Sequence, residues 1–291
     1  MKPASVGFFI SKILCLNTVD IEEGYFMELE INVIDAFTDT IFKGNSAAVI
    51  MTDQWLSDSL MQSIAIENNL SETAFLVQCA PHAYAIRWFS PIMEIDFCGH
   101  ATLASAYVLF HKNPHMPSIT FRAKAVGDLL VVKTPAGQIQ MDFPNRKPEK
   151  VTDIPAALTA GLSIVPREVY RNNQAYIVIY ASESDVLNVT RDNETLKQLA
   201  PHDVVVTTHS QSSDYDFISR YFWPASGGDE DPVTGSIHTG LAPLWAERLN
   251  KNELVAYQAS ARGGVLYCTV TDDRVLVSGS AVPYLKGHIS V

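Results

Sequence analysis

Three consecutive acidic residues, Asp229, Glu230 and Asp231, stand just ahead of a turn of small residues that opens a predicted helix at about 236–249. A helix N-terminus carries unpaired N–H groups and partial positive charge, so it binds carboxylates and phosphates. The turn at Gly235 and Ser236 therefore predicts a small anionic ligand. Asp231 then either caps the helix or acts on the ligand by moving a proton or orienting it. A metal site made of the three acids would need a loop that wraps them around one centre.

A second glycine-led helix is predicted over 99–112, and three reactive side chains lie at or near its start. His100 follows Gly99 and either transfers protons near neutral pH or caps its own helix. Glu72 lies at a helix-to-strand junction in NLSETAF. Partial desolvation there would favour its protonated form and suit it to acid/base chemistry, and a solvated surface position is the alternative. Cys98 is interpreted as a buried structural residue rather than a nucleophile or acid/base thiol, because 231–238 contains no second thiol.

The two helix starts belong to similar stretches, RWFSPIMEIDFCGHATLASAYVLF and RYFWPASGGDEDPVTGSIHTGLAPLW. Each has an arginine, aromatic residues and a proline, then acids, then a glycine-led helix of small residues. Gly99 and Gly235 are 136 positions apart, close to half of the chain's 291 residues. Internal similarity of this kind indicates duplication, with chance similarity as the alternative. Two facing copies would place both helix starts at one central cleft.

The elements around these helices predict an α+β fold, because strands outnumber helices and occur in runs. A helix is expected over 53–70 with Asp53 as its N-cap. The polar, proline-bearing stretch at 145–155 is the best linker candidate. The predicted organisation is an N-terminal extension, a first α+β domain and a second α+β domain, at 1–26, 27–145 (with 280–291 as a candidate last strand) and 146–279.

Composition excludes several function classes. A net charge of −11 without a Lys/Arg cluster argues against nucleic acid and anionic membranes as partners. The four cysteines are scattered, without zinc spacing, which favours a reduced cytoplasmic location. Within residues 1–26, the apolar stretch VGFFISKILCLN is interrupted by Lys12 and is too short and too polar to span a bilayer. The chain has no G-x-G-x-x-G, P-loop or G-x-S-x-G motif, so nucleotide and serine-hydrolase functions lack their usual support.

From about Met27 to the end, the chain resembles the PhzF family, which is named for phenazine biosynthesis. The resemblance rests on DAFTDTIFKGNSAAVI, NLSETAFLV, IDFCGHATLASAYVLF, EDPVTGSIHTGLAPLW and QASARGG, in that order. It implies a diaminopimelate epimerase-like fold of two pseudo-symmetric domains, each a mostly antiparallel sheet wrapped around a central helix. It also implies a homodimer and an isomerase that moves a proton on a small carboxylic acid without cofactor or metal. In the member that names the family, the substrate is a dihydro-hydroxyanthranilate.

The resemblance also implies the site residues. Glu72 is the implied general acid/base, with His100 and Asp231 as helpers. The implied substrate-binding residues are Asn45, Ser71, Gly99, Gly235 and Ser236. The stretch GNSAAV departs from the family, in which proline commonly follows the asparagine. The motifs do not specify the substrate.

Other functions fit the same residues. An epimerase or racemase of an amino-acid-like acid would need a second base, for which Asp231 and Cys98 are the candidates. The sequence argues against a racemase with two cysteines, since only Cys98 lies near a motif. A non-catalytic protein of the same fold would bind a small acid without turnover. A metal-dependent hydrolase would lose its activity when a chelator is added.

Overall fold

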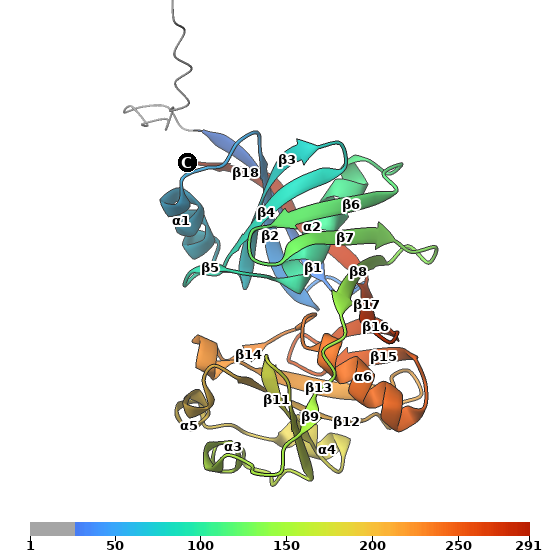
Figure 1. The fold of residues 1–291 in the computed structure, drawn as a ribbon. Coiled ribbons are helices and arrows are strands. Elements are labelled where there is room, and N and C mark those ends of the chain that lie inside the picture. The colour runs from blue at the N-terminus through green and yellow to red at the C-terminus, as the bar shows by residue number, and fades with distance from the viewer. Residues whose placement is uncertain (1–26) are drawn as a thin grey trace, which may run out of the picture.

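The computed structural model describes residues 27–291, which form two lobes joined along β8 and β17 (Figure 1). The predicted N-terminal extension lies outside the described residues. The first lobe contains β1 (Glu28–Ala36), β2 (Asn45–Thr52), α1 (Asp58–Asn68), β3 (Glu72–Ala80), β4 (Ala83–Phe89), β5 (Glu94–Ile95), α2 (Gly99–Lys112), β6 (Ser118–Ala123), β7 (Gly127–Lys133), β8 (Ile139–Pro144) and β18 (Ala281–Ser290).

The second lobe continues the chain from β9 to β17. It contains β9 (Glu149–Lys150), α3 (Ala156–Ala160), β10 (Glu168–Arg171), β11 (Ala175–Ile179), α4 (Glu183–Asn188), α5 (Asn193–Leu196), two short 3₁₀ helices η1 (Lys197–Leu199) and η2 (Pro224–Ser226), β12 (Asp203–His209), β13 (Phe217–Phe222), β14 (Glu230–Asp231), α6 (His238–Leu249), β15 (Glu253–Gln258), β16 (Gly264–Val270) and β17 (Arg274–Gly279). No helix among residues 27–291 combines the length and the apolar character needed to cross a membrane.

The two lobes repeat one pattern of strand pairing. Antiparallel β1–β2, parallel β2–β3 and antiparallel β3–β4 correspond to β10–β11, β11–β12 and β12–β13. Parallel β4–β6 and antiparallel β6–β7 and β7–β8 correspond to β13–β15, β15–β16 and β16–β17. The predicted α+β fold of two pseudo-symmetric domains is therefore confirmed, and the repeated strand pairing favours duplication over chance similarity.

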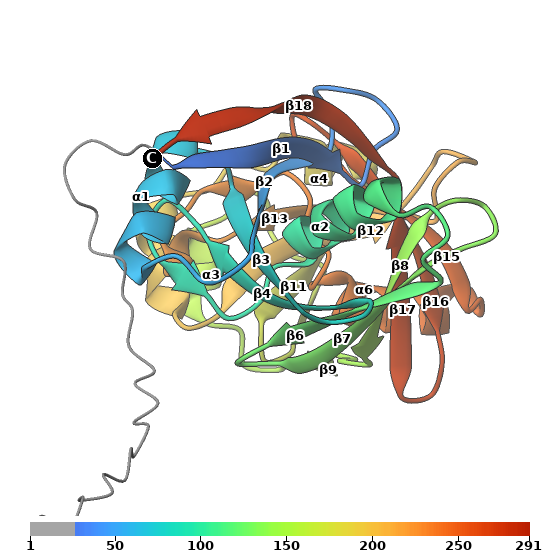
Figure 2. The ribbon, with the colours of Figure 1, turned by 90° about the horizontal axis from the view of Figure 1, so that it is seen from above.

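Each lobe wraps its strands around a central helix. Every residue of α2 from Gly99 to Phe110 is buried except Tyr107, and α2 packs against β1, β2 and β3 (Figure 2). Helix α6 is buried from His238 to Ala246 and packs against β15, β16 and β17. A helix enclosed by strands must be apolar and small on all sides, which explains why both sequences are rich in alanine, glycine and leucine.

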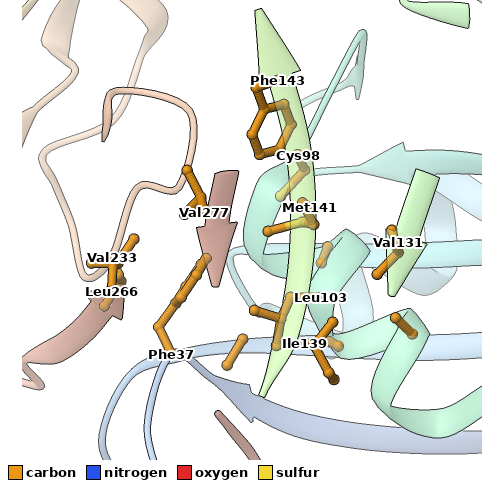
Figure 3. Close-up of a cluster of buried hydrophobic side chains, with 14 of the residues drawn as sticks. Phe37, Cys98, Leu103, Val131, Ile139, Met141, Phe143, Val233, Leu266 and Val277 are labelled. Atoms are coloured by element: carbon orange, nitrogen blue, oxygen red, sulfur yellow. The ribbon is translucent and has the colours of Figure 1, made fainter. Parts of the chain in front are cut away.

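One strand pairing, the return of the last strand and one aromatic side chain connect the lobes. β17 pairs with β8 along its whole length, and the last strand, β18, returns to pair with β1. Phe37 is fully buried at the junction, between Val233 and Leu266 on one side and Leu103 on the other (Figure 3). This shared core places the starts of α2 and α6 next to each other.

Helix α1 is shorter than the sequence predicted, and Asp53 is not its N-cap. The helix spans Asp58–Asn68, and Ser57 caps it by accepting a hydrogen bond from the Leu60 backbone N–H at 3.2 Å. Asn69 ends the helix in the left-handed conformation, with φ of 47°. Both Asp and Ser are good cap residues, so residue preference alone did not distinguish the two positions.

Replacing Ser57 with alanine is therefore expected to lower the free energy of unfolding by about 1 kcal/mol, the usual cost of removing an N-cap. The matched change Asp53→Ala is expected to leave stability unchanged. Urea denaturation of both variants measures the difference. A larger loss for Asp53→Ala than for Ser57→Ala would contradict the observed start of α1.

Candidate active site

The starts of α2 and α6 meet backbone to backbone. A Cβ atom built on Gly99 would lie 3.5 Å from the Gly235 Cα and 3.6 Å from the Ser236 backbone nitrogen. A Cβ atom on Gly235 would lie 3.1 Å from the Phe37 ring, which is tighter than ordinary contact. An alanine at 235 would therefore require the buried Phe37 ring to shift. Since the first N–H groups of a helix lack intrahelical partners, the two helix starts together present donors for an anion.

Glu72 is the first residue of β3 and reaches the start of α2. Its Oε2 atom lies 2.9 Å from the His100 Nε2 atom, and the two side chains are only 12% and 5% exposed. The contact has ion-pair distance but not the alignment of a hydrogen bond. Among residues 27–291, no donor makes a hydrogen bond to this buried oxygen. Glu72 therefore holds a buried lone pair that is free to take a proton.

Asn45 lies next to the Glu72–His100 pair and connects it to Asp231. The Asn45 amide donates one hydrogen bond to the Asp231 Oδ1 atom at 2.7 Å and one to the Val233 carbonyl at 3.0 Å. Its Oδ1 atom accepts from the Ser71 hydroxyl at 2.9 Å. Asn45 is fully buried and both of its amide protons are taken. These contacts support a positioning role for Asn45.

The charges of the cluster favour a protonated histidine. Burial opposes the charged imidazolium, but the Glu72 and Asp231 carboxylates outweigh it and raise the pKa of His100. Burial raises the pKa of Asp231 to about 6, against the influence of His100. The Asp231 carboxyl also accepts a hydrogen bond from the Thr234 hydroxyl. The cluster therefore combines a histidine that favours its charged form with Asp231, an acid that exchanges its proton near neutral pH.

Cys98 is buried and lies beside His100, with its Sγ atom 3.4 Å from the His100 Nδ1 atom. Burial, and then the Glu72 charge, raise the pKa of the Cys98 thiol well above its usual value. Ligand atoms of Glu72, Cys98 and His100 all lie within 4.8 Å of one another. A metal ion would require a thiolate and a neutral imidazole, whereas this environment favours the protonated form of both.

Several alternatives left open by the sequence are contradicted. Neither α2 nor α6 has a side-chain N-cap, so His100 and Asp231 do not cap their helices. The three consecutive acids point to different partners, which excludes a metal site made of them. Asp229 pairs with Arg191 at 2.6 Å and Glu230 with Arg220 at 2.8 Å, while Asp231 turns inward to Asn45.

Sequence reasoning missed two side chains of the QASARGG motif that hold the loops of the site. Gln258 is fully buried, accepts from the Thr234 backbone N–H at 2.9 Å and donates to the Asp231 carbonyl at 2.8 Å. Arg262 donates to the Gly44 carbonyl at 2.7 Å and to the Asp35 carboxylate at 2.8 Å. The motif therefore fixes the turn that carries Asp231 and the turn that carries Asn45. The motif's presence was visible in the sequence, but its partners were not.

The second lobe contributes Ser236 and three further polar residues that the sequence analysis did not select. Ser236 Oγ accepts a hydrogen bond from Gln174 Nε2 at 2.9 Å. Gln174 also contacts the Tyr221 hydroxyl, which donates to Asp203. The structure thus brings Glu72, His100 and Asp231 into one cluster with Asn45 and Ser71 behind it, and places Gly99, Gly235 and Ser236 at the meeting helix starts.

Comparisons with known proteins agree with this arrangement. The sequence model of the PhzC-PhzF family, described as phenazine biosynthesis-like protein, matches residues 34–287. An uncharacterized isomerase of Halalkalibacterium halodurans is 44% identical over 266 residues, covering 90% of this chain and 99% of the relative. The crystal structure of a PhzF family protein from Enterococcus faecalis superimposes with a TM-score of 0.84 at 42% identity, covering 90% of this chain and 99% of that chain.

A predicted epimerase from Pseudomonas aeruginosa has the same fold. It superimposes with a TM-score of 0.69 at 21% identity, covering 90% of this chain and 99% of the other. At this identity the comparison shows the fold alone. The pairing of two similar lobes around two central helices is therefore shared with proteins named as epimerases.

Proposed function

Because the chain belongs to the PhzC-PhzF family of phenazine biosynthesis-like proteins, we propose that it is an isomerase that moves a proton on a small carboxylic acid without a cofactor. The observation that carries the proposal is the buried Glu72 Oε2 atom, which has no hydrogen-bond donor among the described residues and lies 2.9 Å from His100. A buried carboxylate oxygen with a free lone pair is placed to accept a proton from carbon.

The proposed reaction has two proton transfers. Glu72 takes a proton from a C–H bond activated by a neighbouring carboxylate or enamine, and the electron pair moves onto the substrate. The resulting carboxylic acid of Glu72 then returns a proton to another carbon of the same molecule, and its acidic proton exchanges with solvent between the two transfers in a fraction of turnovers. Proton count and charge are therefore unchanged overall, and the double bond is shifted.

The surrounding groups stabilise the intermediate. The negative charge that develops on the substrate is opposed by the His100 imidazolium and by N–H groups at the starts of α2 and α6. Glu72 and His100 are nearly closed to solvent, at 12% and 5% exposed. Restricted access of water protects the intermediate, and the residual exposure of Glu72 lets its acidic proton exchange with solvent.

An epimerase of an amino-acid-like acid is the alternative that the geometry keeps open. Asp231 is a second carboxyl group in the same cluster, and burial raises its pKa to about 6, which suits a second base. An epimerase returns the proton to the same carbon on its opposite face. It therefore changes configuration, whereas the proposed isomerase changes the position of a double bond.

Deuterium exchange tests the proposal. The protein is incubated in D2O with a panel of small cyclic and amino-acid-like carboxylic acids, and loss of C–H signals is followed by proton NMR. We expect at least one acid to exchange a proton adjacent to its carboxylate or enamine. Chiral chromatography of that acid then separates isomerisation from epimerisation.

A panel without exchange would count against the proposed catalysis. Thermal stabilisation of the protein by one of the same acids would in that case support a binding protein of this fold.

A homodimer in the reduced cytoplasm is proposed together with this function. Light scattering of the purified protein checks the dimer, because a monomeric mass would exclude it.

A further inference from the structure

The duplication gives Glu72 a counterpart in the second lobe. In the first lobe, the parallel pair β2–β3 places Ala47 opposite Glu72. In the second lobe, the equivalent pair β11–β12 places Ala175 opposite Asp203. Each acid is the first residue of its strand. Asp203 therefore occupies the position that Glu72 occupies in the first lobe.

The next strand confirms this correspondence. The residue after each acid faces a phenylalanine, Phe89 in β4 and Phe222 in β13. Each of these phenylalanines in turn pairs with a glutamate of the short following strand, Glu94 in β5 and Glu230 in β14. The equivalence of Glu72 and Asp203 thus follows from strand register and needs no sequence similarity between them.

Asp203 is a buried acid without a cation. It is 9% exposed, and no lysine, arginine or histidine forms an ion pair with it among residues 27–291. The more deeply buried Asp35, by contrast, pairs with Arg262 at 2.8 Å. Burial raises the pKa of Asp203 to about 6, against hydrogen bonds from Tyr221 and Ser226. A lone buried carboxylate costs folding free energy, which makes it a candidate for a functional role.

A chain of hydrogen bonds runs from Asp203 to Ser236. The Tyr221 hydroxyl donates to the Asp203 Oδ2 atom at 2.8 Å. The Gln174 Nε2 atom donates to the Tyr221 oxygen at 3.1 Å and to the Ser236 Oγ atom at 2.9 Å. An amide nitrogen has two protons and accepts none, so both of its protons are used. Ser236 is therefore an acceptor toward Gln174, and its own hydroxyl proton remains available.

We propose that Asp203 is a positioning residue that fixes the direction of this chain, so that Ser236 donates its hydroxyl proton to an anionic oxygen of the substrate. The proposal rests on the proposed function, because it assumes a carboxylate at the starts of α2 and α6. Ser236 directly follows Gly235, whose backbone touches Gly99 beside His100. The second lobe thus contributes a hydroxyl donor across from the imidazolium of the first.

The direction of the chain depends on Asp203 because an ionised carboxylate only accepts hydrogen bonds. Tyr221 must then donate to Asp203 and accept from Gln174, which turns the amide nitrogen of Gln174 toward Ser236. An asparagine at 203 can donate to the Tyr221 oxygen instead. Tyr221 would then donate to Gln174, the amide would turn over, and its oxygen would take the proton of Ser236.

Other titratable groups near Asp203 do not replace it in this role. Tyr221, from β13, is kept protonated because burial and Asp203 raise its pKa well above the usual value. Ser226, from η2, lies 3.3 Å from the other oxygen of Asp203 and leads to no residue of the site. Asp231, from β14, is also an acid and offers no proton donor at neutral pH once ionised.

The affinity for a small carboxylate distinguishes the proposed positioning role of Asp203 from the simple effect of its negative charge. Sodium benzoate is titrated at pH 7.5 into wild type, Asp203→Asn, Tyr221→Phe and Ser236→Ala, and binding is followed by NMR. Removing a negative charge would by itself tighten binding of an anion. We expect Asp203→Asn to weaken it about tenfold, the loss that follows when one hydrogen bond to a charged oxygen is removed. Ser226→Ala, which touches the same carboxylate, is expected to leave binding unchanged.

A double variant tests the connection between the two residues. In the Ser236→Ala background, Asp203→Asn is expected to cause no further loss, because both changes remove the same donor. Additive losses, or tighter binding by Asp203→Asn alone, would overturn the proposal. The pH dependence adds a further readout, since Asp203 and Asp231 both gain a proton near pH 6 and the contribution of Asp203 is the difference between the wild-type and Asp203→Asn binding curves in that range.

A neutron crystal structure tests the direction of the hydrogen bonds from Asp203 to Ser236 without any ligand. In wild type, deuterons are expected on Tyr221 toward Asp203 and on Gln174 toward Ser236. The Gln174 amide should be reversed in Asp203→Asn. A Gln174 oxygen facing Ser236 in wild type would overturn the proposal. Failure of the proposed function looks different, because the panel would then show no deuterium exchange while the neutron structure still showed the chain.

Discussion

Glu72→Gln is expected to slow deuterium incorporation into the responsive acid of the panel about a thousandfold or more. General acid/base catalysis by one side chain contributes about 10² to 10⁴ in rate, and Glu72 is proposed to act in both proton transfers. Glutamine keeps the size of the side chain but has no lone pair basic enough to take a proton from carbon. Exchange rates from NMR, at saturating concentration of the acid, measure the loss.

The matched control is Glu67→Gln, which changes an exposed glutamate on α1 in the same lobe. It is expected to exchange at the wild-type rate. Thermal unfolding of both variants checks that the fold is intact. Exchange by Glu72→Gln within about tenfold of wild type would show that another group is the base, and Asp231 would then be the first candidate.

The fold was predictable because its two central helices have unusual sequences. The glycine-led, alanine-rich starts at Gly99 and Gly235 occur in similar contexts, and a helix enclosed by strands requires such residues. The similarity of the two stretches therefore reports a spatial repeat, which the strand pairing confirms. The same reasoning identified His100 and Asp231 as candidate site residues, because each lies within a few residues of one of these glycines.

The positioning residues were not predictable from the sequence in the same way. Gln174 lies just before β11, Asp203 begins β12 and Tyr221 lies in β13. Nothing in their local sequence indicates that they are connected by hydrogen bonds. Their contact depends on the register of β11, β12 and β13, which only the folded sheet defines. The hydrogen bonds of Asn45 were also not predictable, because their partners Asp231, Val233 and Ser71 are distant from it in the sequence.

The two lobes use equivalent positions for different purposes. In the first lobe the acid at the start of β3 touches the residue that follows the helix glycine, His100, directly. In the second lobe the equivalent acid, Asp203, reaches the equivalent residue, Ser236, only through Tyr221 and Gln174. The two lobes therefore provide two similar half-sites, to which the proposals assign a base in the first lobe and a fixed hydroxyl donor in the second. Such an asymmetric pair suits a proton that leaves and returns on one side of the substrate.

Asp231→Asn is expected to slow deuterium exchange about a hundredfold and to shift its pH dependence. The Asp231 carboxylate helps Glu72 to raise the pKa of His100, against the effect of burial. Removing its charge lowers the pKa of His100, so the imidazolium is lost at lower pH. Activity that needs the imidazolium falls as pH rises through that pKa, and the alkaline fall should therefore occur at lower pH in Asp231→Asn than in wild type.

Asp231→Asn is expected to lower the exchange rate without lowering the free energy of unfolding. The folded-state pKa of Asp231 is raised from 3.8 to about 6, so the folded protein binds this proton more tightly than the unfolded chain. Stability therefore decreases as pH rises from about 4 to 6, and the loss persists at higher pH. Asparagine removes this cost while keeping the oxygen that accepts from Asn45. Asp231→Asn is thus expected to be at least as stable as wild type at pH 7.5.

Measuring the exchange rate and the melting temperature of the same variants separates a catalytic from a structural role for Asp231. Asp229→Asn is the matched control, because Asp229 lies two residues away and pairs with Arg191 outside the cluster. It should exchange at the wild-type rate with an unchanged pH profile. A slow and unstable Asp231→Asn would show that the carboxylate mainly supports the loop. A slow variant of full stability would show that the protein keeps a costly buried acid because that acid sets the charge of His100.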